Sequence, residues 1–151
     1  MASEEEMAMK ITSPEFKNNG FMPKKFTCQG QNVNPELLIE GIPSKTKSLA
    51  LIVEDPDASI GTWTHWAVYN MPLATNIEED SVPGDLAMND FRRKEYGGPC
   101  PPSGTHRYFF KLYALDTELD LQQDAGKREL ERAMEGHILE KAEIAGLYKR
   151  Q

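Results

Sequence analysis

The chain has 151 residues and a formal net charge of −7, with 39% hydrophobic and 27% charged residues. This length fits one domain with a hydrophobic core, and the composition excludes an intrinsically disordered protein. The negative charge argues against general binding to nucleic acid or anionic membranes, and no apolar run approaches the roughly 18 residues of a membrane span.

The N-terminal sequence MASEEEMAMK is acidic and lacks the apolar core of a signal peptide. We therefore expect residues 1–8 to be a disordered or frayed lead-in and residues 9–151 to form a single domain. Cys28 and Cys100 are too few for a disulfide framework and have no CxxC spacing. Both are expected to be reduced, so the predicted location is cytoplasmic.

Four apolar segments predict β-strands, at 9–12, 48–54, 65–71 and 106–115. Residues 48–54 (SLALIVE) are apolar at both parities, which fits a strand that is buried on both faces. The stretches between the strands are rich in Gly, Pro and Asn, so a meandering loop is expected at 18–35. The long segment 78–104 is also predicted to be a loop, and long loops in compact domains are often functional.

The C-terminal part has a different pattern. From Lys127 to Leu147, apolar residues recur every three or four positions, which predicts an amphipathic helix that Gly136 breaks or kinks. The predicted fold is therefore mainly β, an antiparallel β domain with a C-terminal helical element packed on it.

Titratable residues gather where the predicted strands begin and end. Asp55 and Asp57 flank a proline after the strand at 48–54, which is common in ordinary turns as well as in binding sites. His65 and His106 each stand at the start of a later strand. Because side chains two residues apart share a face of a strand, we expect His106 and Tyr108 to point into one cavity and Arg107 to point away.

Three kinds of chemistry fit such a cluster. Two histidines and an aspartate are able to hold zinc with an open position, and a His–Asp pair is able to act in acid–base catalysis. The third is anion recognition by imidazoles, a tyrosine hydroxyl and glycine N–H groups. Neither Ser103 nor Cys100 lies in a recognised nucleophile motif. Trp63, two residues before His65, is a candidate for the wall of a pocket.

Five segments in this order resemble the phosphatidylethanolamine-binding protein family, which includes the Raf kinase inhibitor proteins, and in particular its bacterial and archaeal branch. They are FTCQGQNVNPEL (26–37), LALIVEDPDA (49–58), TWTHWAVYNMP (62–72), YGGPCPPSGTHRYFFKLYAL (96–115) and MEGHILEKAEIAGLY (134–148). Together they extend over nearly all of the chain after Met9.

The resemblance implies a β-sandwich around a large antiparallel sheet, with a small anion-accepting pocket at one end. The implied ligand-binding residues are Asp55, Asp57, His65, Gly98, Pro99, His106 and Tyr108. It implies a regulatory protein that binds a small phosphate-bearing or other anionic ligand, with no cofactor, no metal and no catalytic residue. A protein kinase, a protease and a second copy of the chain are the expected protein partners, and a hydrolase that uses the same Asp and His residues is the alternative.

Overall fold

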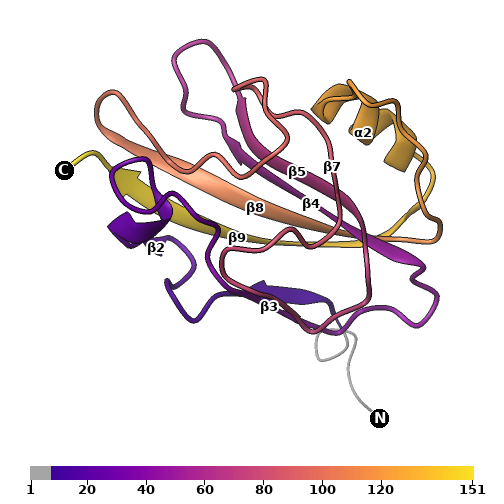
Figure 1. Ribbon diagram of the computed structural model, residues 1–151. Coiled ribbons are helices and arrows are strands. Elements are labelled where there is room, and N and C mark those ends of the chain that lie inside the picture. The colour runs from indigo at the N-terminus through magenta and orange to yellow at the C-terminus, as the bar shows by residue number, and fades with distance from the viewer. Residues whose placement is uncertain (1–7) are drawn as a thin grey trace.

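The computed structural model describes residues 8–151, which form two β-sheets, a short 3-10 helix and one α-helix (Figure 1). The larger sheet has the strand order β2-β9-β8-β4-β5-β7 and the smaller sheet has the order β1-β3-β6. All strand pairs within the two sheets are antiparallel except β2 and β9. The predicted mainly β fold is therefore confirmed.

The larger sheet is built from β2 (Gly20–Phe21), β4 (Ser48–Asp55), β5 (Trp63–Met71), β7 (Asp85–Leu86), β8 (Thr105–Leu115) and β9 (Ile138–Lys149). The smaller one is built from β1 (Lys10–Thr12), β3 (Leu37–Glu40) and β6 (Asn76–Ile77). The 3-10 helix η1 is Lys24–Phe26, and the α-helix α2 is Lys127–Met134. An eight-residue helix is far too short to cross a membrane, and no other described segment offers a membrane-spanning helix.

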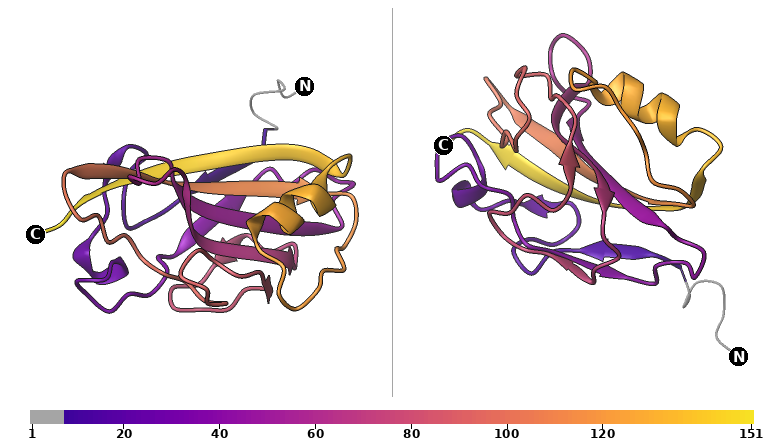
Figure 2. Two further views of the ribbon diagram at one scale, coloured as in Figure 1. Left: turned by 90° about the horizontal axis from the view of Figure 1, so that it is seen from above. Right: turned by 45° about the vertical axis from the view of Figure 1, so that its right-hand side comes forward.

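The larger sheet is covered on both faces. The right-hand view of Figure 2 shows α2 on one side of it and the smaller sheet on the other. Strand β4 lies at the centre, so its residues alternate between two cores: Leu49, Leu51 and Val53 pack towards the smaller sheet, while Ala50 and Ile52 pack towards α2. This arrangement explains why the strand is apolar at both parities.

The same alternation separates the two acidic residues at the end of β4. Glu54 faces the helix side, where its carboxylate pairs with Nζ of Lys127 at 2.6 Å and of Lys111 at 3.0 Å. Asp55 faces the side of the smaller sheet, together with the first residues of β8 that share its parity, His106 and Tyr108. Strand parity therefore sends Glu54 to a structural ion-pair cluster and Asp55 to the candidate site.

The predicted helix over 127–147 is wrong after Met134. The helix ends there, Gly136 adopts a positive φ of 78°, and the chain returns as the long strand β9 beside β8. The first half of the pattern is helical, because Leu130 and Met134 are buried against the larger sheet. In the second half the competing feature is strand pairing, which extends along the whole of β8.

The remaining strand predictions are largely confirmed. Strands lie at or near the four expected segments, and the loop at 18–35 contains only β2 and η1. Strand β3 was not predicted, and the loop at 78–104 contains the two-residue strand β7. The expected lead-in 1–8 lies outside the described residues except for Ala8, and Met9 is buried in the core.

Candidate functional site

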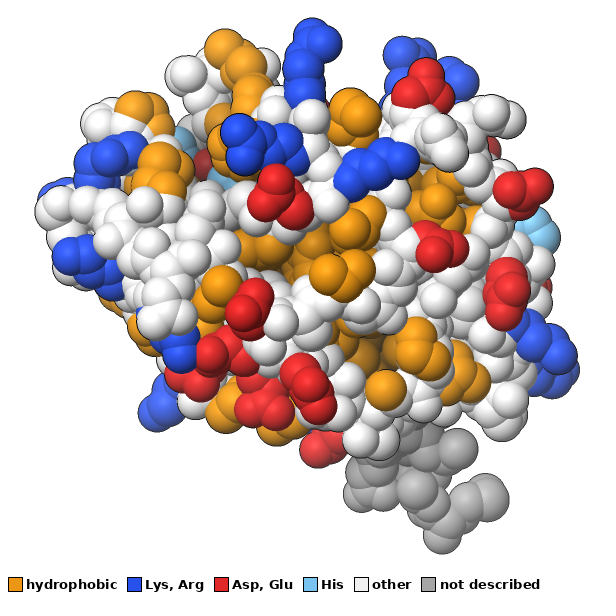
Figure 3. All heavy atoms as spheres, in the orientation of Figure 1, with side chains coloured by type: hydrophobic (Ala, Val, Ile, Leu, Met, Phe, Trp, Pro, Cys, Tyr) orange, Lys and Arg blue, Asp and Glu red, His pale blue; other side chains and the backbone are white. Residues whose placement is uncertain are grey.

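Three strand ends meet at one end of the larger sheet and enclose a cavity of about 220 Å³. They are the end of β4, the start of β5 and the start of β8. Four of the predicted site residues line this cavity: Asp55, His65, His106 and Tyr108. Figure 3 shows pale blue imidazole atoms in a hollow at the upper left, with hydrophobic and basic side chains around it.

The carboxylate of Asp55 fixes the ring of His106. Nδ1 of His106 lies 2.6 Å from Oδ2 of Asp55, and both side chains are largely buried. The other carboxylate oxygen, Oδ1, accepts a hydrogen bond from the backbone N–H of Asp57 at 2.7 Å. Because a carboxylate accepts, the proton of this contact lies on Nδ1 of His106, and Nε2 is the ring nitrogen left for a ligand.

A β-bulge places His65 in the same cavity. Val53 pairs with Trp66 and Glu54 pairs with Thr64, so His65 is the extra residue in β5. Without the bulge, strand parity would direct this side chain towards α2, like Ala67. In the structure its ring instead lies edge-on to Tyr108, with 5.2 Å between the ring centroids.

The loop after β7 holds the His65 ring in place. Nδ1 of His65 lies 2.7 Å from the carbonyl oxygen of Gly97, and Phe91 packs edge-on against the ring at 5.3 Å. Burial lowers the pKa of His65, and the nearby Gly97 carbonyl and Asp55 carboxylate only partly oppose this effect. His65 is therefore neutral at neutral pH, with its proton on Nδ1 and a lone pair on Nε2.

Tyr108 forms the floor of the cavity. Its ring stacks on His106 with 6.4 Å between centroids, and the residue is 1% exposed. Burial, followed by the charge of Asp55, raises the pKa of the Tyr108 hydroxyl, which stays protonated. The backbone of Cys100 lies near this oxygen and slightly lowers its pKa, but the hydroxyl completes no hydrogen bond with any described residue. The hydroxyl is therefore a buried polar group beneath the cavity that has no partner among the described residues.

Three other predicted site residues lie outside this cavity. Asp57 forms two side-chain contacts with Arg107, at 2.8 and 2.9 Å. This ion pair lowers the pKa of Asp57 to about 2. Arg107 does point away from the cavity, so the strand-parity prediction for β8 is confirmed.

Gly98 and Pro99 support the cavity from behind. The backbone N–H of Gly98 donates to Oδ1 of Asn32, and the carbonyl of Pro99 accepts from the N–H of Cys28. A Cβ atom at Gly98 would lie 2.4 Å from the carbonyl oxygen of Phe26. Gly98 therefore allows a close approach to the chain's own backbone.

The expectation that the cysteines are reduced is wrong. Cys28 and Cys100 form a disulfide across 72 residues of sequence, with their Cα atoms 5.4 Å apart. Cys100 also lines the cavity. Sequence spacing gave no signal for this pair, because the fold brings together two loops that are far apart along the chain.

The mouth of the cavity is more apolar than the sequence indicated. Trp63, which was a candidate wall residue, does line it, and so do residues that were not singled out: Ala58, Ser59, Ile60, Phe91, Pro101 and Pro102. The side chain of Phe91 is held between Trp63 and His65. Its position after Asn89-Asp90 in a long loop gives no periodic pattern from which to predict this role.

The three chemistries fit this geometry to different degrees. Within residues 8–151, no group of three or more His, Cys, Asp and Glu side chains is arranged to hold a metal ion. The Asp55–His106 pair has the form of a histidine oriented by a carboxylate, which suits acid–base catalysis as well as hydrogen bonding to a ligand. The unpartnered Tyr108 hydroxyl and the two ring nitrogens suit recognition of an oxygen-rich group.

Comparison with known sequences gives one consistent family. The family model for phosphatidylethanolamine-binding protein matches residues 12–149. A UPF0098 protein of Pyrococcus horikoshii is 48% identical over 160 residues, which cover 98% of this chain and 80% of the relative. A UPF0098 protein of Methanothermobacter thermautotrophicus is 47% identical, with 94% of this chain and 99% of the relative covered.

Solved structures agree with the sequence matches. The crystal structure of a phosphatidylethanolamine-binding protein homologue from Chlamydia trachomatis has a TM-score of 0.91 at 40% identity, covering 95% of this chain and 99% of that one. Escherichia coli YbcL, described as a new member of the mammalian family, has a TM-score of 0.88 at 30% identity with the same coverage. These matches confirm the resemblance predicted from the sequence.

Proposed function

Because this chain belongs to the phosphatidylethanolamine-binding protein family, we propose that it is a regulatory protein that binds a phosphate-bearing ligand in the cavity between His65 and His106. One observation carries the proposal. Each histidine is fixed through Nδ1, His106 by Asp55 and His65 by Gly97, which leaves both Nε2 atoms for a ligand in the same cavity.

The two imidazoles offer different chemistry. Asp55 is able to stabilise a positive charge on His106, so Nε2 of that ring donates to an anionic oxygen. Neutral His65 presents a lone pair on Nε2, which accepts a hydrogen bond from the ligand. The ring of Tyr108 packs against both imidazoles and supports them from below.

A ligand that both accepts and donates satisfies this arrangement best. The phosphate dianion carries no proton, so it is unable to donate a hydrogen bond to the lone pair of His65 or to the carboxylate of Asp55. A singly protonated phosphate monoester is able to donate through its P–OH group. A zwitterionic head group such as phosphorylethanolamine is able to donate through its ammonium group. We place Asp57, Gly98 and Pro99 in supporting roles behind the site.

The biological setting belongs to the same proposal. We expect the protein to act on a kinase, a protease or another copy of itself through the rim of the cavity, and to work in the cytoplasm. In a reducing compartment, the Cys28–Cys100 bond would be exposed to exchange with thiols.

Isothermal titration calorimetry with O-phosphorylethanolamine, inorganic phosphate and ethanolamine tests this function. We expect one site per chain that takes the phosphate-bearing probes and not ethanolamine. His106→Ala should weaken binding by about 1.5–3 kcal/mol, the range for a hydrogen bond to a charged group. His137→Ala is the matched control, since His137 is an exposed imidazole that also contacts an aspartate, Asp116. Absence of binding by the wild-type protein, or equal losses in both variants, would refute the proposal.

The hydrolase alternative has one observation in its favour. The Asp55–His106 pair resembles the base of a hydrolytic site, and the side chain of Ser59 lines the same cavity. Turnover of p-nitrophenyl phosphate that is lost in both His106→Ala and Ser59→Ala would favour catalysis over binding alone.

A further inference from the structure

The Cys28–Cys100 disulfide is part of the wall of the ligand cavity. It joins the loop after η1 to the glycine-proline loop that precedes β8. Cys100 lines the 220 Å³ cavity, and both cysteines line a second cavity of about 280 Å³ on the other side of Phe91. A change in the disulfide therefore acts directly on the site.

The two sulfur atoms have different surroundings. Cys28 is exposed, whereas Cys100 is half-buried. Nη2 of Arg150 lies 3.1 Å from Sγ of Cys100, and its Nε donates to the carbonyl oxygen of Pro101 at 3.2 Å. Among the residues that the structure describes, no carboxylate forms an ion pair with Arg150. Its charge is therefore available to stabilise a thiolate at Cys100.

We propose that the Cys28–Cys100 disulfide is a site of thiol–disulfide exchange, and that its opening loosens the cavity wall and weakens ligand binding. The inference rests on the proposed function for its effect on the ligand. The site of exchange itself follows from the exposure of Cys28 and the position of Arg150.

The exchange has two balanced steps with a dithiol as reductant. A thiolate of the reductant attacks Sγ of Cys28, which is the exposed residue of the pair, the S–S bond breaks, and Cys100 leaves as a thiolate beside Arg150. The second thiol of the reductant then attacks the mixed disulfide. Cys28 is released as a thiolate, and the reductant leaves as its own disulfide. The protein gains two electrons and the reductant loses two.

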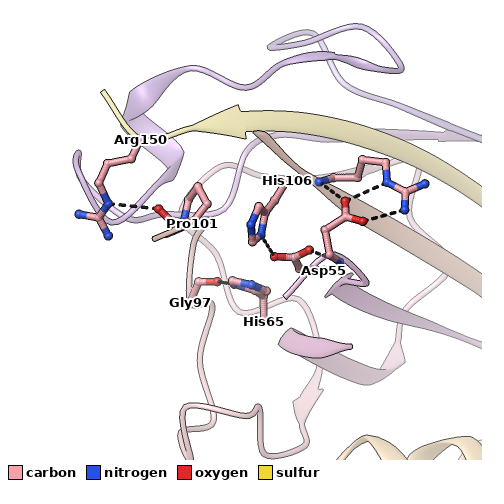
Figure 4. Close-up of polar contacts among 8 residues, drawn as sticks. Asp55, His65, Gly97, Pro101, His106 and Arg150 are labelled. Atoms are coloured by element: carbon pink, nitrogen blue, oxygen red, sulfur yellow. Dashed lines mark hydrogen bonds and ion pairs between the residues drawn. The ribbon is translucent and has the colours of Figure 1, made fainter. Parts of the chain in front are cut away.

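The hydrogen bonds around Cys100 determine which part of the wall is released. Before Cys100 the loop has anchors that do not depend on the disulfide: the Tyr96 hydroxyl donates to the carbonyl of Phe26, and Gly98 donates to Asn32. After Cys100, Arg150 holds the carbonyl of Pro101, and residues 102–105 are exposed. Figure 4 shows Pro101 between Arg150 and His106. Reduction should therefore leave residues 100–104 held only through Arg150, while the His65–Gly97 contact stays in place.

Calorimetry with O-phosphorylethanolamine on the oxidised protein, on the protein reduced with dithiothreitol and on the Cys28→Ser/Cys100→Ser variant tests the coupling. We expect affinity to fall by about threefold to tenfold in the latter two, because a freed loop must be ordered again on binding. Circular dichroism should show the same folded spectrum in all three. Equal affinity in the three forms would overturn the inference.

Hydrogen–deuterium exchange gives a second readout that needs no ligand. On reduction, exchange should rise at the N–H of Cys100 and at that of Cys28, which donates to the carbonyl of Pro99. It should stay unchanged at the N–H groups of Gly97 and Gly98, which donate to His65 and Asn32. Faster exchange at Cys100 and Cys28, with no probe bound even by the oxidised protein, would refute the proposed function and support the exchange site. Unchanged exchange on reduction would overturn the inference whether or not the probe binds.

The role of Arg150 has its own test. In the Cys28→Ser protein, the rate of alkylation of Cys100 by iodoacetamide at neutral pH reports its thiolate fraction. Arg150→Gln should slow this reaction, and Arg128→Gln, on the exposed face of α2, should leave it unchanged. Equal rates in all three proteins would overturn the assignment of Cys100 as the leaving thiolate.

Discussion

The carbonyl oxygen of Gly97 lies 2.7 Å from Nδ1 of His65, and because a carbonyl only accepts, this contact fixes the tautomer of the neutral ring. The backbone N–H of Gly97 in turn donates to the carbonyl of His65, so the two residues are joined in both directions. The imidazole of His65 is thus held as an acceptor towards the cavity, next to the imidazole of His106, whose Nδ1 is held by Asp55.

Burial lowers the pKa of His65, and this shift makes the stability of the fold depend on pH. Between the lowered folded pKa and the unfolded value of about 6.5, the unfolded chain binds the extra proton. The stabilisation from a neutral His65 is therefore fully present above about pH 6.5 and is lost as the pH falls towards the folded pKa. We expect His65→Gln to lose this part of the acid sensitivity.

Urea denaturation at about pH 7.5 and about pH 5 measures this acid sensitivity. The decrease in unfolding free energy between the two pH values includes the contribution of His65. His137→Gln is the control, since the His137 ring is exposed. A His65→Gln protein with the same pH dependence as the wild type would contradict the expectation.

Gly97 and Gly98 should differ in how well they tolerate a methyl group. A Cβ at Gly97 would meet the ring of Phe91 at 2.6 Å, and that ring is partly exposed and able to move. A Cβ at Gly98 would meet the backbone oxygen of Phe26 at 2.4 Å, which cannot move without the loop. We expect Gly98→Ala to cost about 1–3 kcal/mol of unfolding free energy or more, and Gly97→Ala to cost less.

A double-mutant cycle checks the cause. In a Phe91→Ala background, the cost of Gly97→Ala should shrink while that of Gly98→Ala stays the same. Gly126→Ala serves as the control, because its Cβ would meet only ordinary contacts, the nearest at 3.5 Å. Equal costs at Gly97 in both backgrounds would show that Phe91 is not the obstacle.

Strand parity correctly predicted the direction of several side chains at the site. His106, Tyr108 and Arg107 lie on the faces expected of them, because β8 continues without a bulge past all three. His65 entered the candidate site through its place at the start of a predicted strand and then through the family resemblance, and parity did not predict its direction. The position of His65 depends on the bulge opposite Val53 and Glu54, and no residue type in that segment indicates a bulge.

The misassigned features share a different physical cause. The spacing of Leu130 and Met134 belongs to a real helix, but Ile144, which pairs with Phe110, belongs to a strand. Apolar residues of a strand that is only partly covered are easily aligned with a helical period. The pairing of Cys28 with Cys100 likewise depends on tertiary structure, since it joins two loops 72 residues apart.

Glu54 should stabilise the attachment of α2 to the larger sheet. Burial alone would raise its pKa, but hydrogen bonds and charges from Lys127 and Lys111 outweigh burial and lower it. Its contribution to stability is therefore present above the unfolded pKa of about 4.3 and is lost as the pH falls through the folded pKa. We expect Glu54→Gln to cost about 1–3 kcal/mol near neutral pH, less than for a fully buried pair because both ammonium groups stay partly in water.

Thermal and urea unfolding at about pH 7 and about pH 3 would separate the contribution of the Glu54 charge from that of its uncharged contacts. The variant should approach the stability of the wild type where the carboxylate is protonated. Glu118→Gln, an exposed carboxylate, should be close to neutral. A gap between Glu54→Gln and wild type that is the same at both pH values would mean that charge is not its source.

Asp55 and Asp57 are two residues apart but should have separable roles in ligand binding. Asp55 holds Nδ1 of His106 at 2.6 Å, whereas Asp57 holds Arg107 outside the cavity. In Asp55→Asn the side chain no longer supplies a negative charge, so the positive form of His106 that donates to an anion is less favoured. We expect Asp55→Asn to weaken binding of O-phosphorylethanolamine by about 1.5–3 kcal/mol at pH near 7.

Asp57→Asn removes the partner of Arg107 and should change binding by less than about 0.5 kcal/mol, since the ion pair is at the surface and its groups do not line the cavity. Calorimetry on the wild type and both variants at pH near 7 decides the matter. Equal losses in the two variants would mean that the turn as a whole, and not the Asp55–His106 contact, supports the ligand. A loss confined to Asp57→Asn would place the ligand on the Arg107 side of the turn and remove His106 from the site.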